Sequence, residues 1–266
     1  MQVKEFGLPR IIALVNQKGG VGKSTTTVNL GAALAVLGKR VLVIDLDPQG
    51  NTTTGLGIDK GAIKRDVYDL IMHFASIDEV LCETEIPGLQ IIPATINLAG
   101  AEIELVSALS RENRLKSVVG PIAGAYDFAL IDCPPSLGLL TINALTAAKE
   151  IIIPVQAEYY ALEGLSQLTN VVRRVQEALN PDLVVTGVLV TMFDGRTKLA
   201  MEVLEELNAY FPQQMYKTQI PRNVRLSEAP SYGKPVILFD LKSRGAQAYM
   251  ALAAEMLGTS IQVAAR

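Results

Sequence analysis

The sequence predicts an α/β fold in which a single doubly wound, mostly parallel sheet carries helices on both faces. Short apolar runs recur along the chain, with longer segments of helical periodicity between them, and this alternation is typical of βαβ units. Several runs are apolar without alternation, as expected for strands covered on both faces. A glycine-rich segment directly follows the first apolar run and predicts a loop between the first strand and the first helix.

The expected strands are the short apolar runs Ile11–Val15, Val41–Ile44, Leu89–Ile92, Phe128–Ile131, Ile151–Val155, Leu183–Val190 and Pro235–Leu238. The expected helices follow the apolar period of an α-helix. They are Thr25–Leu37, Leu98–Val119, Leu139–Ala148, Leu162–Leu179, Leu199–Tyr210 and Ser243–Leu257. Gly38 directly follows the first of these helices, and we expect it to cap the carboxyl end.

The chain has 266 residues, of which 49% are hydrophobic, and this is ample for a buried core. It contains no repeat, low-complexity segment or linker. We therefore expect one domain spanning residues 1–266. Residues 1–10 form a short amino-terminal extension, which leaves no room for a separate helix-turn-helix domain.

Charge and cysteine content exclude several functional classes. The formal net charge is -3, so no global positive field attracts nucleic acid or anionic lipid. Cys82 and Cys133 do not form a CxxC pair, which argues against a disulfide framework, a structural zinc or a cysteine-ligated cluster. There is no leader-like segment and no uncharged stretch of roughly 18 residues, so we expect a soluble, cytoplasmic protein. The lone His73 lies in a helix-like apolar stretch and is assigned no function.

The glycine-rich segment has the composition and context of a phosphate-binding loop. It reads Lys18-Gly19-Gly20-Val21-Gly22-Lys23-Ser24. Glycines let successive backbone N–H groups point at phosphate oxygens, and the helix that follows adds favourable partial charge. We expect Lys23 to contact the β- and γ-phosphates of ATP and Ser24 to ligate Mg²⁺. The usual spacing has glycine where this chain has Gln17, so the loop is a variant with an additional lysine, Lys18. A glycine-rich turn with incidental lysines is the alternative.

Three aspartates are expected at the same edge of the sheet as this loop. Asp45 ends the second strand, Asp47 follows two residues later, and Asp132 ends the fourth strand. The carboxyl ends of parallel strands meet beside a phosphate site. One of Asp45 and Asp47 can support Mg²⁺ while the other orients the attacking water, and Asp132 is the natural Walker B carboxylate. Any one of them alone would more often be a helix cap.

Three motifs together resemble the deviant Walker A ATPases of the MinD/ParA family, and within them the ParA/Soj chromosome-partitioning proteins. They are the phosphate loop, Asp45-Leu46-Asp47-Pro48-Gln49-Gly50 and Ile131-Asp132-Cys133-Pro134-Pro135-Ser136. The resemblance covers nearly the whole chain. It includes the segments at residues 156–164, 191–197 and 220–230.

The resemblance implies a role for each site residue. Lys18 is the signature lysine that reaches the partner's phosphates across a nucleotide-sandwich homodimer, while Lys23 serves its own subunit. Asp47 is favoured over Asp45 for positioning the attacking water, and Asp45 then supports the magnesium. Contacts to the nucleotide are implied for Lys18, Gly19, Gly20, Val21, Gly22, Lys23, Ser24 and Thr25, and near adenine for Met192, Phe193, Pro221 and Asn223.

A local basic surface is expected towards the carboxyl end of the chain. Between residues 211 and 246 there are six basic residues, Lys217, Arg222, Arg225, Lys234, Lys242 and Arg244, against the two acidic residues Glu228 and Asp240, so the net charge is six minus two, or +4. On charge alone an ordinary solvated surface is the better interpretation. The resemblance reverses this ranking, because Soj-like proteins bind nonspecific double-stranded DNA as ATP dimers. It points to Arg196, Lys198, Arg222 and Arg225, with Arg222 also beside the expected adenine site.

The resulting hypothesis is an ATP-dependent DNA-partitioning ATPase with ATP and Mg²⁺ as cofactors. ATP dimers would bind nucleoid DNA, and hydrolysis stimulated by a centromere-binding protein of the ParB type would release them, driving chromosome or plasmid segregation. One alternative is a ParA-type positioner of a protein cargo. Another is a MinD-like membrane ATPase, but the tail from Thr259 to Arg266 has one basic residue and no aromatic, which argues against membrane binding. An electron carrier like the nitrogenase reductase would need paired cysteines, which this chain lacks.

Overall fold

A seven-stranded sheet organises the fold in the computed structural model, which describes residues 9–158 and 161–259. The strands are β1 (Arg10–Leu14), β2 (Val41–Asp45), β3 (Cys82–Glu83), β4 (Leu89–Ile92), β5 (Phe128–Asp132), β6 (Glu150–Gln156) and β7 (Val184–Thr191). Their order across the sheet is β3-β4-β2-β5-β1-β6-β7. All neighbouring strands pair in parallel except β3, which runs antiparallel to β4. The predicted fold class is therefore confirmed.

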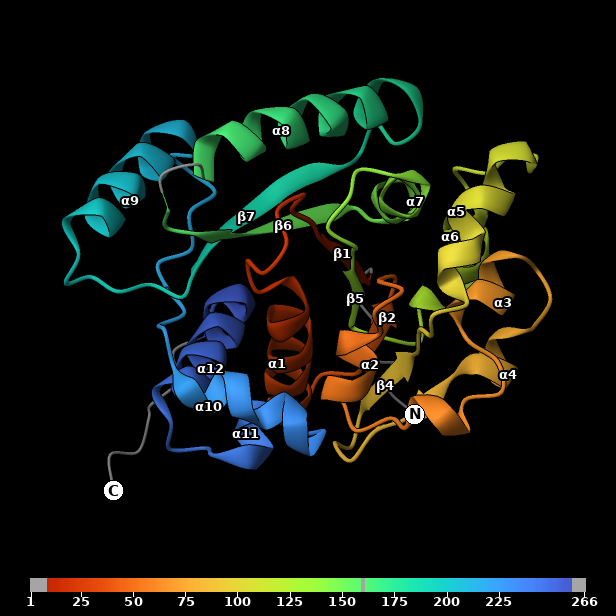
Figure 1. The fold of residues 1–266 in the computed structure, drawn as a ribbon, viewed down its shortest axis with the longest axis horizontal. Coiled ribbons are helices and arrows are strands. Elements are labelled where there is room, and N and C mark those ends of the chain that lie inside the picture. Colours follow the sequence, from red (N-terminus) through yellow and green to blue (C-terminus); the bar gives the residue numbers. More distant parts are fainter. Residues whose placement is uncertain (1–8, 159–160, 260–266) are drawn as a thin grey trace, which may run out of the picture.

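Helices cover both faces of this sheet (Figure 1). One face is covered by α1 (Lys23–Val36), α10 (Val224–Glu228), α11 (Val236–Phe239) and α12 (Arg244–Leu257). The other face is covered by α3 (Val67–Ile71), α4 (Ile77–Val80), α5 (Leu98–Glu104), α6 (Arg114–Ala123), α7 (Leu139–Ala147), α8 (Ala161–Ala178) and α9 (Lys198–Tyr210). The short helix α2 (Asn51–Gly55) follows β2. Three single turns are η1 (Lys60–Ala62), η2 (Leu105–Ser107) and η3 (Ala229–Tyr232).

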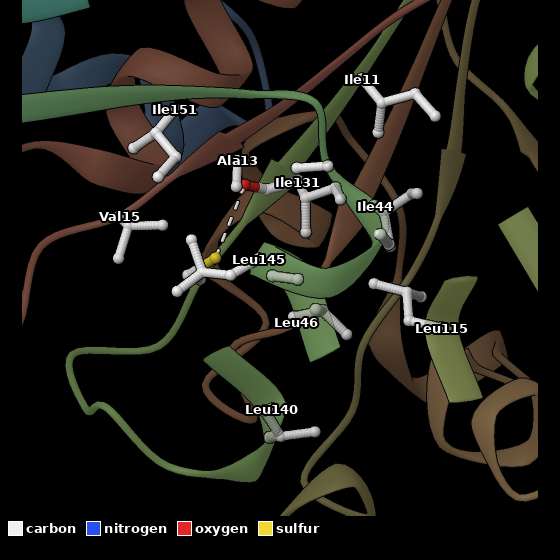
Figure 2. Close-up of a cluster of buried hydrophobic side chains, with 14 of the residues drawn as sticks. Ile11, Ala13, Val15, Ile44, Leu46, Leu115, Ile131, Leu140, Leu145 and Ile151 are labelled. Carbon is white, nitrogen blue, oxygen red and sulfur yellow. Dashed lines mark hydrogen bonds between the residues drawn. The ribbon is translucent and has the colours of Figure 1, made fainter. Parts of the chain in front are cut away.

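The two helical layers explain why the central strands are apolar at every position. Successive side chains of a strand point to opposite faces. In β1, Ile11 and Ala13 join the core under α3–α9, as the close-up in Figure 2 shows, while Ile12 and Leu14 join the core under α1 and α12. Both sets are buried, so β1 carries no polar alternation.

The single helix expected over residues 98–119 is broken in the structure. Helix α5 ends at Glu104, the turn η2 ends at Ser107, and α6 begins only at Arg114. Ser110 between them has a left-handed φ of 52°, which a right-handed helix does not tolerate. In addition, Asn143 of α7 donates to the Arg111 carbonyl at 2.8 Å and accepts from the Leu115 N–H at 3.1 Å. Tertiary hydrogen bonds therefore override the continuous apolar pattern.

The expected strand at Pro235–Leu238 is wrong, because these residues belong to the short helix α11. The Val236 N–H donates to Asn29 Oδ1 of α1 at 2.7 Å, which fixes α11 against α1 instead of in the sheet. An apolar run of four residues fits either structure. The antiparallel β3 was not expected at all. Gly38 follows α1 with a left-handed φ of 82°, as its predicted capping position requires.

Candidate nucleotide-binding and active site

The phosphate loop connects β1 to α1, as the sequence predicts. Gly20 and Gly22 have φ angles of 74° and 88°, a region that glycine adopts without strain. The loop is fixed to the neighbouring strands at both ends. Thr191 at the end of β7 donates through Oγ1 to the Val21 carbonyl at 2.7 Å. Asn16 accepts from the Lys18 N–H at 2.9 Å and donates to the Pro154 carbonyl at 2.8 Å.

The two lysines of the loop have different environments. Lys23 is buried, and its Nζ donates to the Lys18 carbonyl at 3.2 Å. Burial lowers the pKa of Lys23, and the nearby Asp132 carboxylate opposes this shift. The Lys18 side chain is 41% exposed, and its Nζ pairs with Glu158 Oε2 at 2.6 Å. Lys23 therefore lies inside the loop, whereas Lys18 points to the segment that follows β6.

The three aspartates gather at the carboxyl edge of the sheet. Asp45 and Asp132 are fully buried, and Asp47 is 7% exposed. Asp45 accepts from the Thr53 N–H at 2.8 Å, from the Thr53 hydroxyl at 2.7 Å and from the Asp47 N–H at 3.1 Å. Burial raises the pKa of Asp45 to about 8, with a further contribution from the Asp132 charge. Asp45 is thus saturated with protein donors, which suits a supporting role.

Asp132 keeps one oxygen free. Its Oδ2 accepts from the Thr52 hydroxyl at 2.6 Å, whereas its buried Oδ1 has no hydrogen-bond partner among the described residues. Burial raises the pKa of Asp132 to about 6, partly offset by hydrogen bonds from the Thr52 and Ser24 hydroxyls. A buried carboxylate oxygen without a partner is unfavourable, and a divalent cation removes that penalty.

These oxygens fit a magnesium site. Mg²⁺ prefers oxygen ligands and takes few of them from the protein, the rest coming from phosphate and water. Ser24 lies in the first turn of α1, and its hydroxyl is among the groups that lower the pKa of Asp132, so it lies close to this carboxylate. Within the described part of the chain, no cluster of three or more His, Cys, Asp or Glu side chains suited to holding a metal occurs. When bound, the ion would supply positive charge at the phosphate oxygens.

A cavity of about 1130 Å³ extends from the loop. Its lining includes Gly19, Gly20, Gly22, Lys23, Ser24, Thr25, Asp47, Met192, Pro221, Arg222 and Asn223. The predicted contacts from the loop and from the distant segment 220–223 are therefore brought together. Lys18 and Val21 do not belong to the lining, because Lys18 turns to Glu158 and the Val21 side chain is buried.

The expected adenine residues divide into two groups. Asn223 lines the cavity, and its buried Oδ1 has no hydrogen-bond partner in the described residues. Met192 also lines the cavity, with a left-handed φ of 49° that is unusual outside glycine. Phe193 does not line the cavity and packs against the core under α8 and α9. Its N–H donates to the Ile220 carbonyl at 2.9 Å, which joins the two segments.

The predicted basic residues lie on two adjoining segments, because the Arg222 N–H donates to the Phe193 carbonyl at 3.2 Å. Most are paired with nearby carboxylates. Arg196 binds Asp194 at 2.6 Å, and Lys198 binds Glu202 at 3.2 Å. Arg225 contacts Glu228 at 2.8 Å and Asp240 at 3.2 Å. The side chains of Arg196 and Lys198 are about 90% exposed, so solvent and ligands reach them.

Sequence reasoning missed the hydroxyl and carboxylate groups that hold the site. Thr52 and Thr53 anchor the buried aspartates, Thr191 anchors the phosphate loop, and Glu158 pairs with Lys18. The polar run Asn51-Thr52-Thr53-Thr54 directly after the aspartate motif was the available signal for the first two. The tail residues 260–266, which carried the argument against membrane binding, lie outside the described residues. Among residues 9–158 and 161–259 no helix has the length and apolarity needed to cross a membrane.

Comparisons with known proteins cover almost the whole chain. A family model described as an AAA domain matches residues 9–185. The sporulation initiation inhibitor protein Soj of Bacillus subtilis (strain 168) is 60% identical over 247 residues, which cover 93% of this chain and 98% of that protein. The chromosome partitioning protein ParA of Myxococcus xanthus is 53% identical over 248 residues, covering 93% and 88%.

Solved structures show the same fold with nucleotide bound. Cobyrinic acid a,c-diamide synthase of Mycobacterium smegmatis with bound ADP and magnesium is 38% identical, with a TM-score of 0.82 and 94% of each chain covered. The septum site-determining protein MinD of Pyrococcus horikoshii OT3, in complex with Mg-ADP, is 26% identical, with a TM-score of 0.76 and coverage of 93% and 96%.

Fold, phosphate loop and buried aspartates define the protein as a phosphate-loop ATPase with ATP and Mg²⁺ as cofactors. The identity to Soj and ParA proteins exceeds half of the aligned positions. The chain belongs to the ParA/Soj family of chromosome-partitioning ATPases. The predicted family and the predicted ATPase activity are confirmed.

Proposed function

We propose that this ATPase partitions DNA by cycling between a monomer and an ATP-bound sandwich dimer. The dimer would bind double-stranded DNA of the nucleoid without sequence preference. Hydrolysis, stimulated by a centromere-binding partner of the ParB type, would return it to the free cytoplasmic state. Residues 1–266 would act as one ATPase domain in this cycle.

The observation that carries this proposal is the position of Lys18. The loop contains two lysines, and only Lys23 lines its own cavity. The Lys18 ammonium lies outside that cavity in an ion pair with Glu158. Exposed ion pairs of this kind contribute no more than about 1 kcal/mol, so the phosphates of a second subunit can compete for Lys18. ATP would then hold the two subunits together.

Hydrolysis is assigned to Asp47. Its Oδ1 accepts from the Gln49 N–H at 2.9 Å, which fixes the carboxylate while the side chain lines the cavity. A carboxylate held in this way can orient a water molecule towards the γ-phosphate. Lys23 would neutralise charge that develops on the phosphates. Asp132 and Ser24 would hold Mg²⁺, with Asp45 supporting them.

DNA binding is assigned to Arg196, Lys198, Arg222 and Arg225. Their exposure supports contact with phosphates, and the carboxylates paired with three of them weaken the attraction in a single subunit. A dimer doubles the number of phosphate contacts, so affinity depends on the ATP state. Such contacts carry no sequence information.

The test compares wild type, Asp47→Ala and Lys18→Gln in ATP and in ADP, at low and at high salt. Sedimentation velocity measures dimerisation, and retention on two unrelated DNA duplexes measures binding. We expect an ATP-specific, salt-sensitive DNA complex for wild type, a persistent one for Asp47→Ala and none for Lys18→Gln. Lys18→Gln should still bind a fluorescent ATP analogue within a few-fold of wild type. ATP binding without dimer or DNA complex in wild type would refute the proposal and leave the ATPase intact.

A further inference from the structure

Helix α5 and the turn η2 are apolar on two opposite faces. The inner face packs into the core through Leu98, Ala101 and Leu105, all fully buried. The outer face carries a second apolar row, which we name the outer stripe and define as Ile96, Ala99, Ile103 and Val106. Spacings of three and four residues place Ala99, Ile103 and Val106 on one side of this helical stretch, and Ile96 lies just before it. Ile103 is 78% exposed and Val106 is 60% exposed. A helix that is apolar on both faces is normally buried on both.

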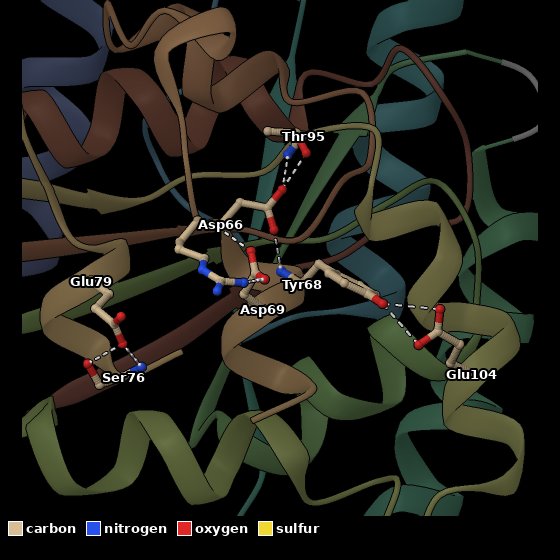
Figure 3. A network of polar contacts seen from close by, with 8 residues as sticks. Asp66, Tyr68, Asp69, Ser76, Glu79, Thr95 and Glu104 are labelled. Atoms are coloured by element: carbon tan, nitrogen blue, oxygen red, sulfur yellow. Dashed lines mark hydrogen bonds and ion pairs between the residues drawn. The ribbon is translucent and has the colours of Figure 1, made fainter. Parts of the chain in front are cut away.

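The outer stripe is presented by a firmly anchored helix. Figure 3 shows the contacts that hold both of its ends. Before the helix, the Thr95 hydroxyl donates to Asp66, which also accepts from the Thr95 N–H at 3.2 Å. At its end, both carboxylate oxygens of Glu104 lie within 3.1 Å of the Tyr68 hydroxyl. The exposure of the outer stripe is therefore a property of a fixed surface.

This surface adjoins the phosphate loop. Helix α5 follows β4 at the carboxyl edge of the sheet, the edge that carries the loop. The segment 134–138 lies between them. A Cβ at Gly19 would be 3.9 Å from Pro135 Cβ, and a side chain at Gly138 would collide with Glu102 Oε1 of α5. The outer stripe and Lys18 therefore border one continuous face of the molecule.

We propose that the outer stripe is the apolar part of the interface with a second copy of this chain in the ATP dimer. The inference rests on the proposed function, because it assigns a surface to the dimer that ATP stabilises. A stable interface buries about 800 Å² on each partner and has an apolar centre. The phosphate face itself offers exposed polar groups, among them Lys18, Gln49 and Asn51, and supplies little of that apolar area. The outer stripe is apolar surface adjoining that face.

The flanking charges favour a second copy over a basic partner. Glu104 is engaged by the Tyr68 hydroxyl, and Glu102 Oε1 is buried against Gly138 without a hydrogen-bond partner in the described chain. Both carboxylates contact groups of this chain, and the four side chains of the outer stripe are themselves uncharged. In a two-fold symmetric contact an uncharged stripe meets its own copy without repulsion between like charges.

The segment 134–138 also joins α5 to the aspartate site. A Cβ at Gly138 would collide with Glu102 Oε1, so this segment and the Glu102 side chain of α5 are in close contact. The same segment directly follows Asp132 and Cys133, and it therefore lies between the proposed magnesium site and the helix that carries the outer stripe.

The experiment measures dimerisation of Ile103→Asp and Val106→Asp with a nonhydrolysable ATP analogue, by sedimentation velocity over a range of concentrations. We expect each variant to weaken the dimer at least ten-fold, because a charge replaces buried apolar area. Binding of the analogue to the monomer should stay within two-fold of wild type. Val184→Asp is the matched control, since Val184 is also exposed but begins β7 at the opposite edge of the sheet, and its dimer should match wild type.

A second measurement uses the wild-type protein alone. Hydrogen exchange of peptides covering residues 96–109 should slow in the analogue relative to ADP, and only at concentrations where the dimer forms. If wild type forms no dimer, the proposed function fails together with this inference. If wild type dimerises and the folded variants Ile103→Asp and Val106→Asp dimerise equally well, the inference is overturned and the proposed function stands. The same holds if wild type dimerises but residues 96–109 gain no protection from hydrogen exchange. A control that weakens the dimer as much as the two variants also overturns it.

Discussion

Asp45 and Asp132 lie directly opposite each other on the adjacent parallel strands β2 and β5. Both are fully buried, and each accepts a hydroxyl hydrogen bond from a threonine of α2. Two carboxyls in one buried site disfavour ionisation, and the pKa values of about 8 and about 6 reflect this. The pair therefore binds protons or a cation instead of standing as two bare anions.

The first prediction is a fall in stability with rising pH for the protein without nucleotide and Mg²⁺. The pKa of Asp45 is raised from 3.8 to about 8, so the folded state holds more protons than the unfolded chain between these values. The stabilisation is complete below the unfolded pKa and is lost as pH rises through the folded one. The melting temperature should fall by on the order of 5 °C between pH 5 and pH 8.5. In Asp45→Asn the decline should flatten, and an unchanged slope would contradict the assignment.

The second prediction concerns Thr52, whose hydroxyl donates to Asp132. Thr52→Val leaves both oxygens of a buried carboxyl without a threonine donor, which should cost about 1–3 kcal/mol of unfolding free energy. Denaturant unfolding measures this loss, and a Mg²⁺ titration of ATP hydrolysis should show weaker activation. Thr54→Val is the control on the same helix, because Thr54 is exposed and its hydroxyl donates to the Gly50 carbonyl instead of to a buried carboxylate. Equal losses in the two variants would argue against a special role for Thr52.

The third prediction compares alanine substitutions at two glycines with left-handed backbone, one of which also lacks space for a side chain. Gly50 has a φ of 60°, and a Cβ there would lie 2.7 Å from the Ala94 carbonyl oxygen. Gly38 has a similar φ of 82° but no atom within 4 Å of its Cβ position. Gly38→Ala should lower the free energy of unfolding by about 1 kcal/mol. Gly50→Ala should lower it by clearly more, about 2–4 kcal/mol, as denaturant unfolding would measure. Because Gly50 precedes α2, Gly50→Ala should also weaken Mg²⁺-dependent hydrolysis. The opposite order of stabilities would refute this account.

The fourth prediction concerns Arg225 in the proposed DNA contact. Each neutralised phosphate contributes nearly one unit to the slope of log affinity against log salt. In an Asp47→Ala background that holds the dimer, Arg225→Ala should lower that slope by about 2, one unit for each subunit. Fluorescence anisotropy across a salt series measures it, with ATP-analogue binding as the check on folding. Arg173→Ala is the control, because it removes an exposed arginine from α8 and should leave the slope unchanged. If the slope stays the same in Arg225→Ala as well, Arg225 does not belong to the DNA contact.

The predictable parts of the site share one property: each can be recognised from a short, continuous run of residues. The phosphate loop is a single run of residues, and Asp45 and Asp132 end strands that are apolar at each preceding position. Interactions between segments that are distant in the sequence produce no such recognisable run of residues. Lys18 and Glu158 are 140 residues apart, and no periodicity connects them.

The two wrong predictions about the fold also arise from interactions between segments that are distant in sequence. The run at residues 235–238 is apolar in either a strand or a helix, and a side chain of α1 decides between them. The break after α5 depends on Asn143 of α7. In both cases a buried amide from another helix supplies hydrogen bonds that the local pattern does not reveal.

The contact between α1 and α12 bears on the order in which the chain is synthesised. Thr26, in the first turns of the helix behind the phosphate loop, shares a buried hydroxyl hydrogen bond of 3.1 Å with Tyr249, 223 residues further along the chain. A ribosome makes the phosphate loop early, yet the helix that supports it gains this partner only when nearly all of the protein has emerged. Incomplete chains would carry the loop without this support, so we expect them to bind ATP more weakly than chains whose synthesis is almost finished.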